Sequence, residues 1–387
     1  MNTKQYKGSS KNANIVAKSI IDHMDKIYES GFYPSVDVIT PESTLYGDST
    51  GEFAMPKELR FYLTREFSKI ISEGNIILVK NGRRRQLKTD IGFLDACEEQ
   101  VNYYKKKLFL FSPERIELSC DRLSHYTASD IDDFQENLLI TNYQMHLNIF
   151  KKLFPKSIGS SEECQMPVLH ARKPGKKGIS IVNIGVGPAN AKTFTDQIAV
   201  LRPSSIVMIG HCGGLIASQQ IGDFILADRF IRDDHVLSAL LSNDTPVGST
   251  LILNNFLLNE IQKKKIPFHI GTVFTTNNRD WEYKISYYRE KFEQSRSCAI
   301  DMESSVICAQ GFRYKIPNAT LLMVSDRPLH GKPKLASASK EFYKKGKELH
   351  IKIAVKAIEA LSKASISNYN LSGFGFNPEL STESMMS

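Results

Sequence analysis

The feature that most constrains the fold is a series of short apolar segments that recurs through the second half of the chain. Each segment is about as long as one β-strand, and helical segments separate some of them. Strands are expected at 167–171, 179–184, 205–209, 224–227, 270–275 and 320–325, and helices at 190–201, 303–312 and 347–363. Alternating apolar strands and helices build a layered α/β structure with a largely buried sheet. The sequence therefore predicts an α/β domain over residues 166–364.

The first half of the chain has a different character and predicts an α+β domain over residues 1–165. Helices are expected at 13–30, at 57–71 after Pro56, and within 131–154, and strands at 75–80 and 85–88. The two strands are expected to pair as a hairpin around Gly82, with Arg83, Arg84 and Arg85 at its solvated tip. The segment 365–387 is rich in Ser and Asn and nearly uncharged, which predicts a flexible tail.

Composition excludes several classes of protein. The chain of 387 residues has 41% hydrophobic and 24% charged residues, as globular proteins do. It has no apolar run of about 18 residues and no secretory signal, so no membrane association is expected. Its six cysteines form no Cys-x-x-Cys pair, which argues against a zinc site or a disulfide scaffold and for the reducing cytoplasm. The net charge of +8 is compatible with nucleic acid, with an anionic small substrate or with no specific partner, and no nucleic-acid-binding motif accompanies it.

Two glycine-rich turns follow predicted strands. Gly185 and Gly187 lie between a strand and a helix, where backbone N–H groups can approach an anion, although a tight strand–helix turn explains them equally well. Gly213 ends a second strand, so the two turns predict a shared ligand crevice. His211 and Cys212 can be read as a base and a nucleophile, but adjacent residues seldom face each other, so this pairing is not expected.

Three carboxylates stand at the ends of predicted elements. Asp301 precedes a predicted helix and is expected to cap it. Glu303 follows Met302, and it can either cap the same helix or accept hydrogen bonds from two sugar hydroxyls. Asp326 ends an apolar strand, where it can donate a proton to a purine ring nitrogen or close an Asx turn before Pro328.

Taken together, several motifs resemble those of the AMP nucleosidases, within the superfamily of purine nucleoside phosphorylases and related nucleosidases. The motifs are VNIGVGPANAKT, MIGHCGG, IGDFILADRFIRDDHVL, TTNNRDWE, AIDMESS and VSDRPLHGKPKL, with YPSV, YGDSTGEF and DRLSHYTA in the first half. The resemblance covers nearly the whole chain. The chain departs from the family in a shorter N-terminal domain, a short connection at 155–165, and Ala128 after Thr127 where glycine is usual.

The resemblance implies hydrolysis of the N-glycosidic bond of AMP to adenine and ribose 5-phosphate. It implies that Asp326 protonates or hydrogen-bonds N7 of the base, that Glu303 holds the ribose hydroxyls, and that Met302 packs under the ribose. Trp281 is expected either to stack on the base or to belong to the core. Water is the expected nucleophile, and no metal or cofactor is expected to be needed for this step.

The resemblance also implies a binding site for the 5′-phosphate and a set of effectors. Arg122, His125, Tyr126 and Thr127 are the expected phosphate ligands, with Arg122 alternatively a salt-bridge partner of Asp121 or Asp130. The turn of Gly185 and Gly187, together with Gly213, is expected to line the anion site of the superfamily. Activation by MgATP, inhibition by phosphate and a homohexamer are further implications. The alternative function is a purine nucleoside phosphorylase, or a nucleosidase acting on a related purine nucleoside or nucleotide.

Overall fold

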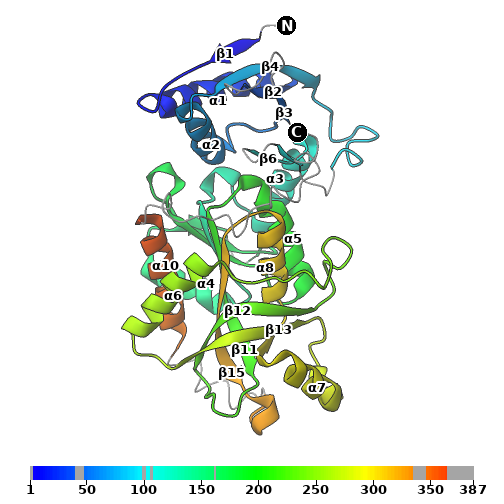
Figure 1. The fold of residues 1–387 in the computed structure, drawn as a ribbon, viewed down its shortest axis with the longest axis vertical. Coiled ribbons are helices and arrows are strands. Elements are labelled where there is room, and N and C mark those ends of the chain that lie inside the picture. The colour runs from blue at the N-terminus through cyan, green and yellow to red at the C-terminus, as the bar shows by residue number, and fades with distance from the viewer. Residues whose placement is uncertain are drawn as a thin grey trace, which may run out of the picture. The chain divides into compact units, whose positions relative to one another are not determined.

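The computed structural model describes residues 3–39, 48–97, 102–104, 108–160, 163–333 and 346–363 (Figure 1). The predicted tail at 365–387 lies outside the described residues, as does part of YGDSTGEF. The chain forms two compact units. The first comprises residues 1–125 with 130–132 and 197–202, and the second comprises 126–129, 133–196 and 203–387. The second unit thus begins earlier than the boundary predicted after residue 165.

The first unit combines a four-stranded antiparallel sheet with helices, as an α+β domain does. Its elements are β1 (Lys4–Tyr6), α1 (Ala13–Glu29), β2 (Phe32–Ile39), β3 (Asp48–Glu52), α2 (Arg60–Ser72), β4 (Ile76–Arg84), β5 (Asn102–Tyr104), β6 (Leu108–Leu110) and α3 (Pro113–Thr127). The strand order of the sheet is β1-β4-β2-β3. The predicted helix at 13–30 is confirmed, and the one expected from residue 57 begins at Arg60.

The predicted hairpin around Gly82 is wrong, because β4 runs through it as one strand and pairs with β2 and β1. The arginines consequently do not form a hairpin tip, although Arg83 and Arg84 are exposed. Arg83 lies 2.6 Å from Glu52 and 3.1 Å from Glu114, and Arg85 lies 3.1 Å from Glu117. Glu114 and Glu117 are fully buried on α3, and a buried carboxylate needs a paired cation.

The second unit is built on a nine-stranded mixed sheet with the order β14-β13-β12-β15-β11-β7-β10-β9-β8. Its strands are β7 (Asn137–Thr141), β8 (Ile158–Gly159), β9 (Val168–Ala171), β10 (Ile179–Asn183), β11 (Ser205–Gly214), β12 (Phe224–Asp233), β13 (Phe268–Thr276), β14 (Ser297–Asp301) and β15 (Asn318–Asp326). The pairs from β15 through β11 and β7 to β10 are parallel, and so are β12–β13 and β13–β14. The predicted α/β class with a mainly parallel sheet is confirmed.

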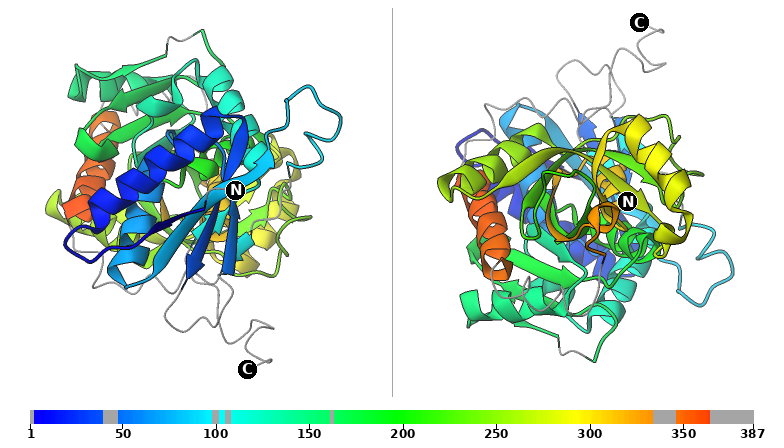
Figure 2. Two further views of the ribbon diagram at one scale, coloured as in Figure 1. Left: turned by 90° about the horizontal axis from the view of Figure 1, so that it is seen from above. Right: turned by 90° about the horizontal axis from the view of Figure 1, so that it is seen from below.

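Helices cover this sheet. They are α4 (Gln144–Leu153), α5 (Pro188–Ile198), α6 (Leu251–Lys263), α7 (Ile285–Ser295), α8 (Ser304–Arg313) and α10 (Lys347–Lys363), with short 3-10 turns such as η4 (Trp281–Lys284) and η5 (Pro328–His330). Helix α10 packs against α4 and α6 over the main apolar core, and Figure 2 shows α10 and α7 at opposite sides of the unit. None of the helices in the described part of the chain has the length and apolar character of a membrane span.

One strand near the centre of the sheet was missed by the sequence analysis. Residues 131–154 were expected to hold a long helix, but β7 occupies 137–141 and α4 only 144–153. All five residues of β7 are buried, between β11 and β10. A short, fully buried strand carries a continuous apolar run, which periodicity cannot distinguish from a buried helix.

Candidate active site

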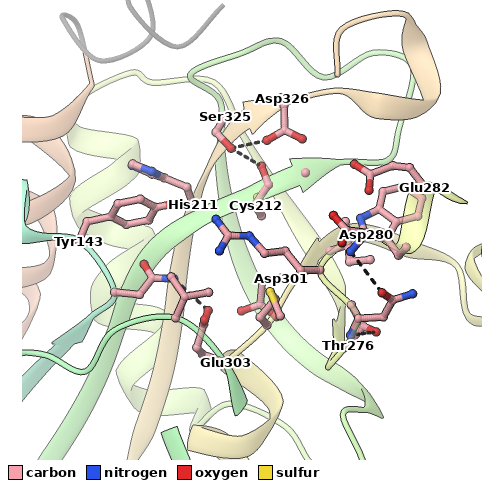
Figure 3. A pocket seen from close by; sticks show the side chains of 18 residues that line it. Tyr143, His211, Cys212, Thr276, Asp280, Glu282, Asp301, Glu303, Ser325 and Asp326 are labelled. Atoms are coloured by element: carbon pink, nitrogen blue, oxygen red, sulfur yellow. Dashed lines mark hydrogen bonds between the residues drawn. The ribbon is translucent and has the colours of Figure 1, made fainter. Parts of the chain in front are cut away.

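A pocket of about 350 Å³ lies where several strands of the second unit end (Figure 3). Thr276, Asp301 and Asp326 are the last residues of β13, β14 and β15, and all three line it. Strand β11 reaches the same place, because its Gly213 pairs with Ile300 of β14 and with Asp326 of β15. Carboxyl ends of strands are where open α/β sheets bind ligands.

Asp326 lines the pocket from the end of β15, where it pairs with Gly213 of β11. The side chain is 6% exposed, and its Oδ1 lies 2.5 Å from the hydroxyl of Ser325. A Cβ atom on Gly213 would lie 3.4 Å from Asp326 Oδ2 and 3.0 Å from Ile300. A side chain at position 213 would therefore press on Ile300 first, and would only touch the carboxylate.

Glu303 is held in the pocket wall by two donors from different segments. The Gly187 N–H donates to its Oε1 at 2.6 Å, and the Asn142 amide donates to its Oε2 at 3.0 Å. Gly187 has φ +114°, which side-chain-bearing residues rarely adopt. Burial, followed by the charge of Asp301, raises the pKa of Glu303 to about 8. The negatively charged form of Glu303 is therefore disfavoured, and a cationic ligand in the pocket would stabilise it.

Asp301 caps α8, as predicted. Its Oδ2 accepts the backbone N–H of Ser304 at 2.9 Å and the hydroxyl of the same residue, and its Oδ1 accepts the hydroxyl of Thr275 at 2.6 Å. Burial raises the pKa of Asp301 as well. Glu303 stands at the N-cap position but makes no capping hydrogen bond with its side chain. Of the two roles considered for Glu303, capping is thus not the one observed.

Met302 and Trp281 both line the pocket. The Trp281 ring also packs edge-on against Tyr288 and Phe292, with ring centroids 5.8 and 5.3 Å apart. It is therefore part of an apolar cluster, and stacking on a base stays a prediction. The contact of Met302 with a ribose also stays a prediction.

The predicted anion-binding glycines have distinct positions. Gly213 lines the pocket. Gly185 and Gly187 instead shape the turn around Val186, and Val186 lines the pocket. Gly185 has φ +72°, so the turn depends on glycine at both positions. The Gly187 N–H already bonds to Glu303. In the described structure this turn positions a carboxylate, and binding of an anion there stays a prediction.

The four predicted phosphate ligands belong to one helix. Arg122, His125, Tyr126 and Thr127 are on α3, and none of them is among the described residues that line the pocket. Arg122 and His125 are exposed and Thr127 is buried. Asp121, a proposed partner of Arg122, pairs with Lys88.

Several pocket residues were missed by the sequence analysis. Asn142 and Tyr143 follow β7, and Arg279 and Asp280 follow β13. Burial and the charges of Glu303 and Asp326 raise the pKa of Tyr143 to about 12, while Arg279 acts in the opposite direction. For Arg279 and Asp280 the available signal was their place after the strand predicted at 270–275, in the motif TTNNRDWE. Asn142 and Tyr143 had no such signal, because the segment before them was expected to be helical.

The sheet is curled and mainly parallel, and the buried carboxylates Asp301 and Asp326 stand at strand ends around the pocket. The chain belongs to the phosphorylase superfamily, whose family model matches residues 158–359. It is 39% identical over 290 residues to the AMP nucleosidase of Escherichia coli K12, covering 65% of this chain and 60% of that protein. The chain thus spans about 60% of the length of this relative.

Solved structures agree with this assignment. The AMP nucleosidase from Bacteroides thetaiotaomicron is 27% identical, with a TM-score of 0.55 over 64% of this chain and 98% of that chain. The purine nucleoside phosphorylase from Toxoplasma gondii, in complex with immucillin-H, is 20% identical, with a TM-score of 0.53 over 60% of this chain and 94% of that chain. The second likeness shows the shared fold alone.

Proposed function

We propose that this protein is an AMP nucleosidase, which hydrolyses AMP to adenine and D-ribose 5-phosphate. One observation carries the proposal: Asp326 and a doubly hydrogen-bonded Glu303 line the same pocket, in a chain 39% identical to a known AMP nucleosidase. Incubation with AMP and analysis of the products tests it. The second candidate is phosphorolysis of a purine nucleoside, which the shared fold with a phosphorylase supports.

Asp326 acts on the leaving group. Cleavage of the bond between C1′ and N9 leaves its electron pair on adenine, so a proton or hydrogen bond at N7 stabilises the departing base. Asp326 is buried at a strand end beside the pocket, where such a contact is shielded from water. A water molecule then attacks C1′ and loses a proton, which completes the hydrolysis.

Glu303 acts on the sugar. Its two oxygens are oriented by Gly187 and Asn142, and each keeps a further lone pair for a ribose hydroxyl. Positive charge develops on the ribose as the bond breaks, and a nearby carboxylate stabilises it. Because burial disfavours the charged carboxylate in the empty site, the interaction strengthens as the sugar becomes cationic.

The raised pKa of Glu303 gives a prediction about pH. Below its folded pKa of about 8 the group is mainly neutral, and the carboxylate is the form that stabilises a cation. We expect kcat/KM for AMP to rise with pH up to about 8, since kcat/KM reports ionisation of the free enzyme. Glu303→Gln should abolish this limb of the profile. A limb that persists in the variant would assign the ionisation to another group.

The 5′-phosphate needs a cationic partner, and Arg279 is a cation that the pocket itself offers. It lines the pocket and forms no ion pair with any described residue. Its charge reaches Tyr143, which lines the pocket too. A charged hydrogen bond to phosphate contributes about 1.5–3 kcal/mol.

Arg279→Ala is therefore expected to raise KM for AMP by about tenfold or more, with a much smaller effect on adenosine, which carries no phosphate. Arg122→Ala is the comparison, because Arg122 was the ligand expected from sequence. Steady-state kinetics of both variants on both substrates separate the two assignments. If only Arg122→Ala raises KM for AMP more than for adenosine, phosphate recognition belongs to α3. An equal loss of activity on AMP and on adenosine would indicate a structural role for the substituted residue.

The remaining features of the proposal follow the family resemblance. We propose a cytoplasmic enzyme that works as a homohexamer, needs no cofactor for the glycosidic step, and responds to MgATP and phosphate. The relatives named AMP nucleosidase support the assignment of a nucleotide substrate. Mass measurement in solution and assays with each effector test these points.

A further inference from the structure

Three buried histidines meet next to the pocket and have no part in the proposed reaction. His146 lies on α4, His211 on β11 and His350 on α10. One ring nitrogen from each lies within 4.8 Å of those of the other two. His146 and His350 are completely buried, and His211 is 6% exposed. Spacing along the chain does not reveal this cluster, because its members are far apart in the sequence.

The protonation state of His350 follows from its backbone contact. Its Nε2 lies 2.7 Å from the carbonyl oxygen of Leu321. A carbonyl can only accept, so Nε2 carries the proton and donates it. Burial lowers the pKa of His350 to about 4, so the ring is neutral and Nδ1 is a bare acceptor. No described residue forms a hydrogen bond with this Nδ1.

His146 presents a second nitrogen in the same way. Its Nδ1 lies 2.6 Å from the hydroxyl oxygen of Thr141, and its buried Nε2 has no hydrogen-bond partner among the described residues. Burial first, and then His350 and Lys347, lower the pKa of His146. When Nδ1–H donates to Thr141, Nε2 is a second bare acceptor. A buried hydrogen-bond acceptor without a donor destabilises the folded protein. A ligand between these rings that accepts their lone pairs would remove this free-energy penalty.

We propose that His146, His211 and His350 form a site for one divalent transition-metal ion of the zinc type. Three neutral imidazoles are a known zinc ligand set, and Zn–N bonds of about 2.0–2.1 Å would bring the nitrogens to about 3.4 Å apart. From a separation of up to 4.8 Å, the rings must therefore close by small side-chain rotations. Thr141 and Leu321 would hold the outer nitrogens and fix the tautomers, as second partners of metal-bound histidines do.

The site would connect the core to the substrate pocket. His211 lines the pocket, and the Tyr143 ring lies 4.4 Å from the His211 ring between centroids. An ion bound to the three histidines would cross-link α4, β11 and α10 next to the part of the pocket that His211 lines. It is not a reactant in the glycosidic step. The charge of Lys347, which acts on His146, opposes a cation and limits the affinity.

Metal content of the untagged full-length protein tests the site. After treatment with a chelator and dialysis, the protein is titrated with Zn²⁺ and with Co²⁺. We expect about one tightly held ion per chain, a visible Co²⁺ spectrum typical of tetrahedral nitrogen ligands, and a rise in the melting temperature on Zn²⁺ addition. His146→Phe, which keeps a ring of similar size, should lower the affinity for the ion by at least about a hundredfold.

The matched control is His170→Asn. His170 is also fully buried, but both its nitrogens are hydrogen-bonded, to Ser129 at 2.9 Å and to Ser180 at 2.8 Å. This variant should keep the ion. The proposal is overturned if the wild-type protein binds no stoichiometric ion, which would leave an ordered water as the occupant, or if His146→Phe and His170→Asn bind the ion equally. The metal titration of the wild-type protein does not depend on any variant, so it tests the proposed site even if His146→Phe does not fold.

Discussion

Asp326→Asn is expected to lower kcat for AMP by about 10²–10⁴-fold, the usual contribution of a general acid, while AMP binding changes by less than about tenfold. Asparagine has nearly the same shape and can still bond to the hydroxyl of Ser325, which lies 2.5 Å from Oδ1. It cannot release a proton to N7. The effect should therefore fall on the transition state and spare the ground state.

Asp280→Asn is the control for this substitution. Asp280 lines the same pocket but is exposed, so the variant makes the same Asp-to-Asn change in the same pocket. We expect a much smaller loss of kcat. Single-turnover measurements, which separate chemistry from product release, decide between the variants. Near-normal turnover by Asp326→Asn at neutral pH would remove Asp326 from the role of acid.

Glu303→Gln is expected to cause the second large loss, of similar order, through two effects. The variant cannot place a negative charge beside the cationic ribose. In addition, an amide offers only one acceptor oxygen to the two donors, Gly187 N–H and the Asn142 amide, that hold the carboxylate. One of the two donors is left facing an NH₂ group, which costs about 1–3 kcal/mol.

A substrate that lacks the 2′-hydroxyl locates Glu303 relative to the sugar. If Glu303 binds this hydroxyl, the variant and 2′-deoxy-AMP remove the same contact, and their effects on kcat/KM should not add. The values of kcat/KM for the wild type and Glu303→Gln, each with AMP and with 2′-deoxy-AMP, form a double-mutant-type cycle. Glu282→Gln is a suitable control, since Glu282 also lines the pocket. Fully additive losses would place Glu303 away from the 2′-hydroxyl.

The sequence predicted the parts of the fold that carry a strong pattern. Helix α10 begins and ends at the predicted residues, and the segments predicted at 167–171, 179–184 and 205–209 lie in strands β9, β10 and β11 of the sheet. Strand β7 was missed because its apolar run has no period, and the β4 hairpin was predicted from a glycine that a continuous strand tolerates.

Some residues predicted from motifs line the pocket, and other residues that line it were missed. Asp326, Glu303, Met302, Trp281 and Gly213 all line the pocket, and each stands in a recognisable motif. Asn142 and Tyr143 could not be placed, because their position depends on β7 lying beside β11. The histidine cluster depends on three separate elements, so no spacing along the chain reveals it.

The most direct test of the central claim is the product of AMP cleavage with and without inorganic phosphate. The purified protein is incubated with AMP, and adenine and the sugar product are separated and identified. A nucleosidase uses water, so we expect adenine and ribose 5-phosphate in equal amounts without any added phosphate. Adenine that forms only when phosphate is present, together with ribose 1,5-bisphosphate, would show a phosphorylase, and no adenine under either condition would contradict the account.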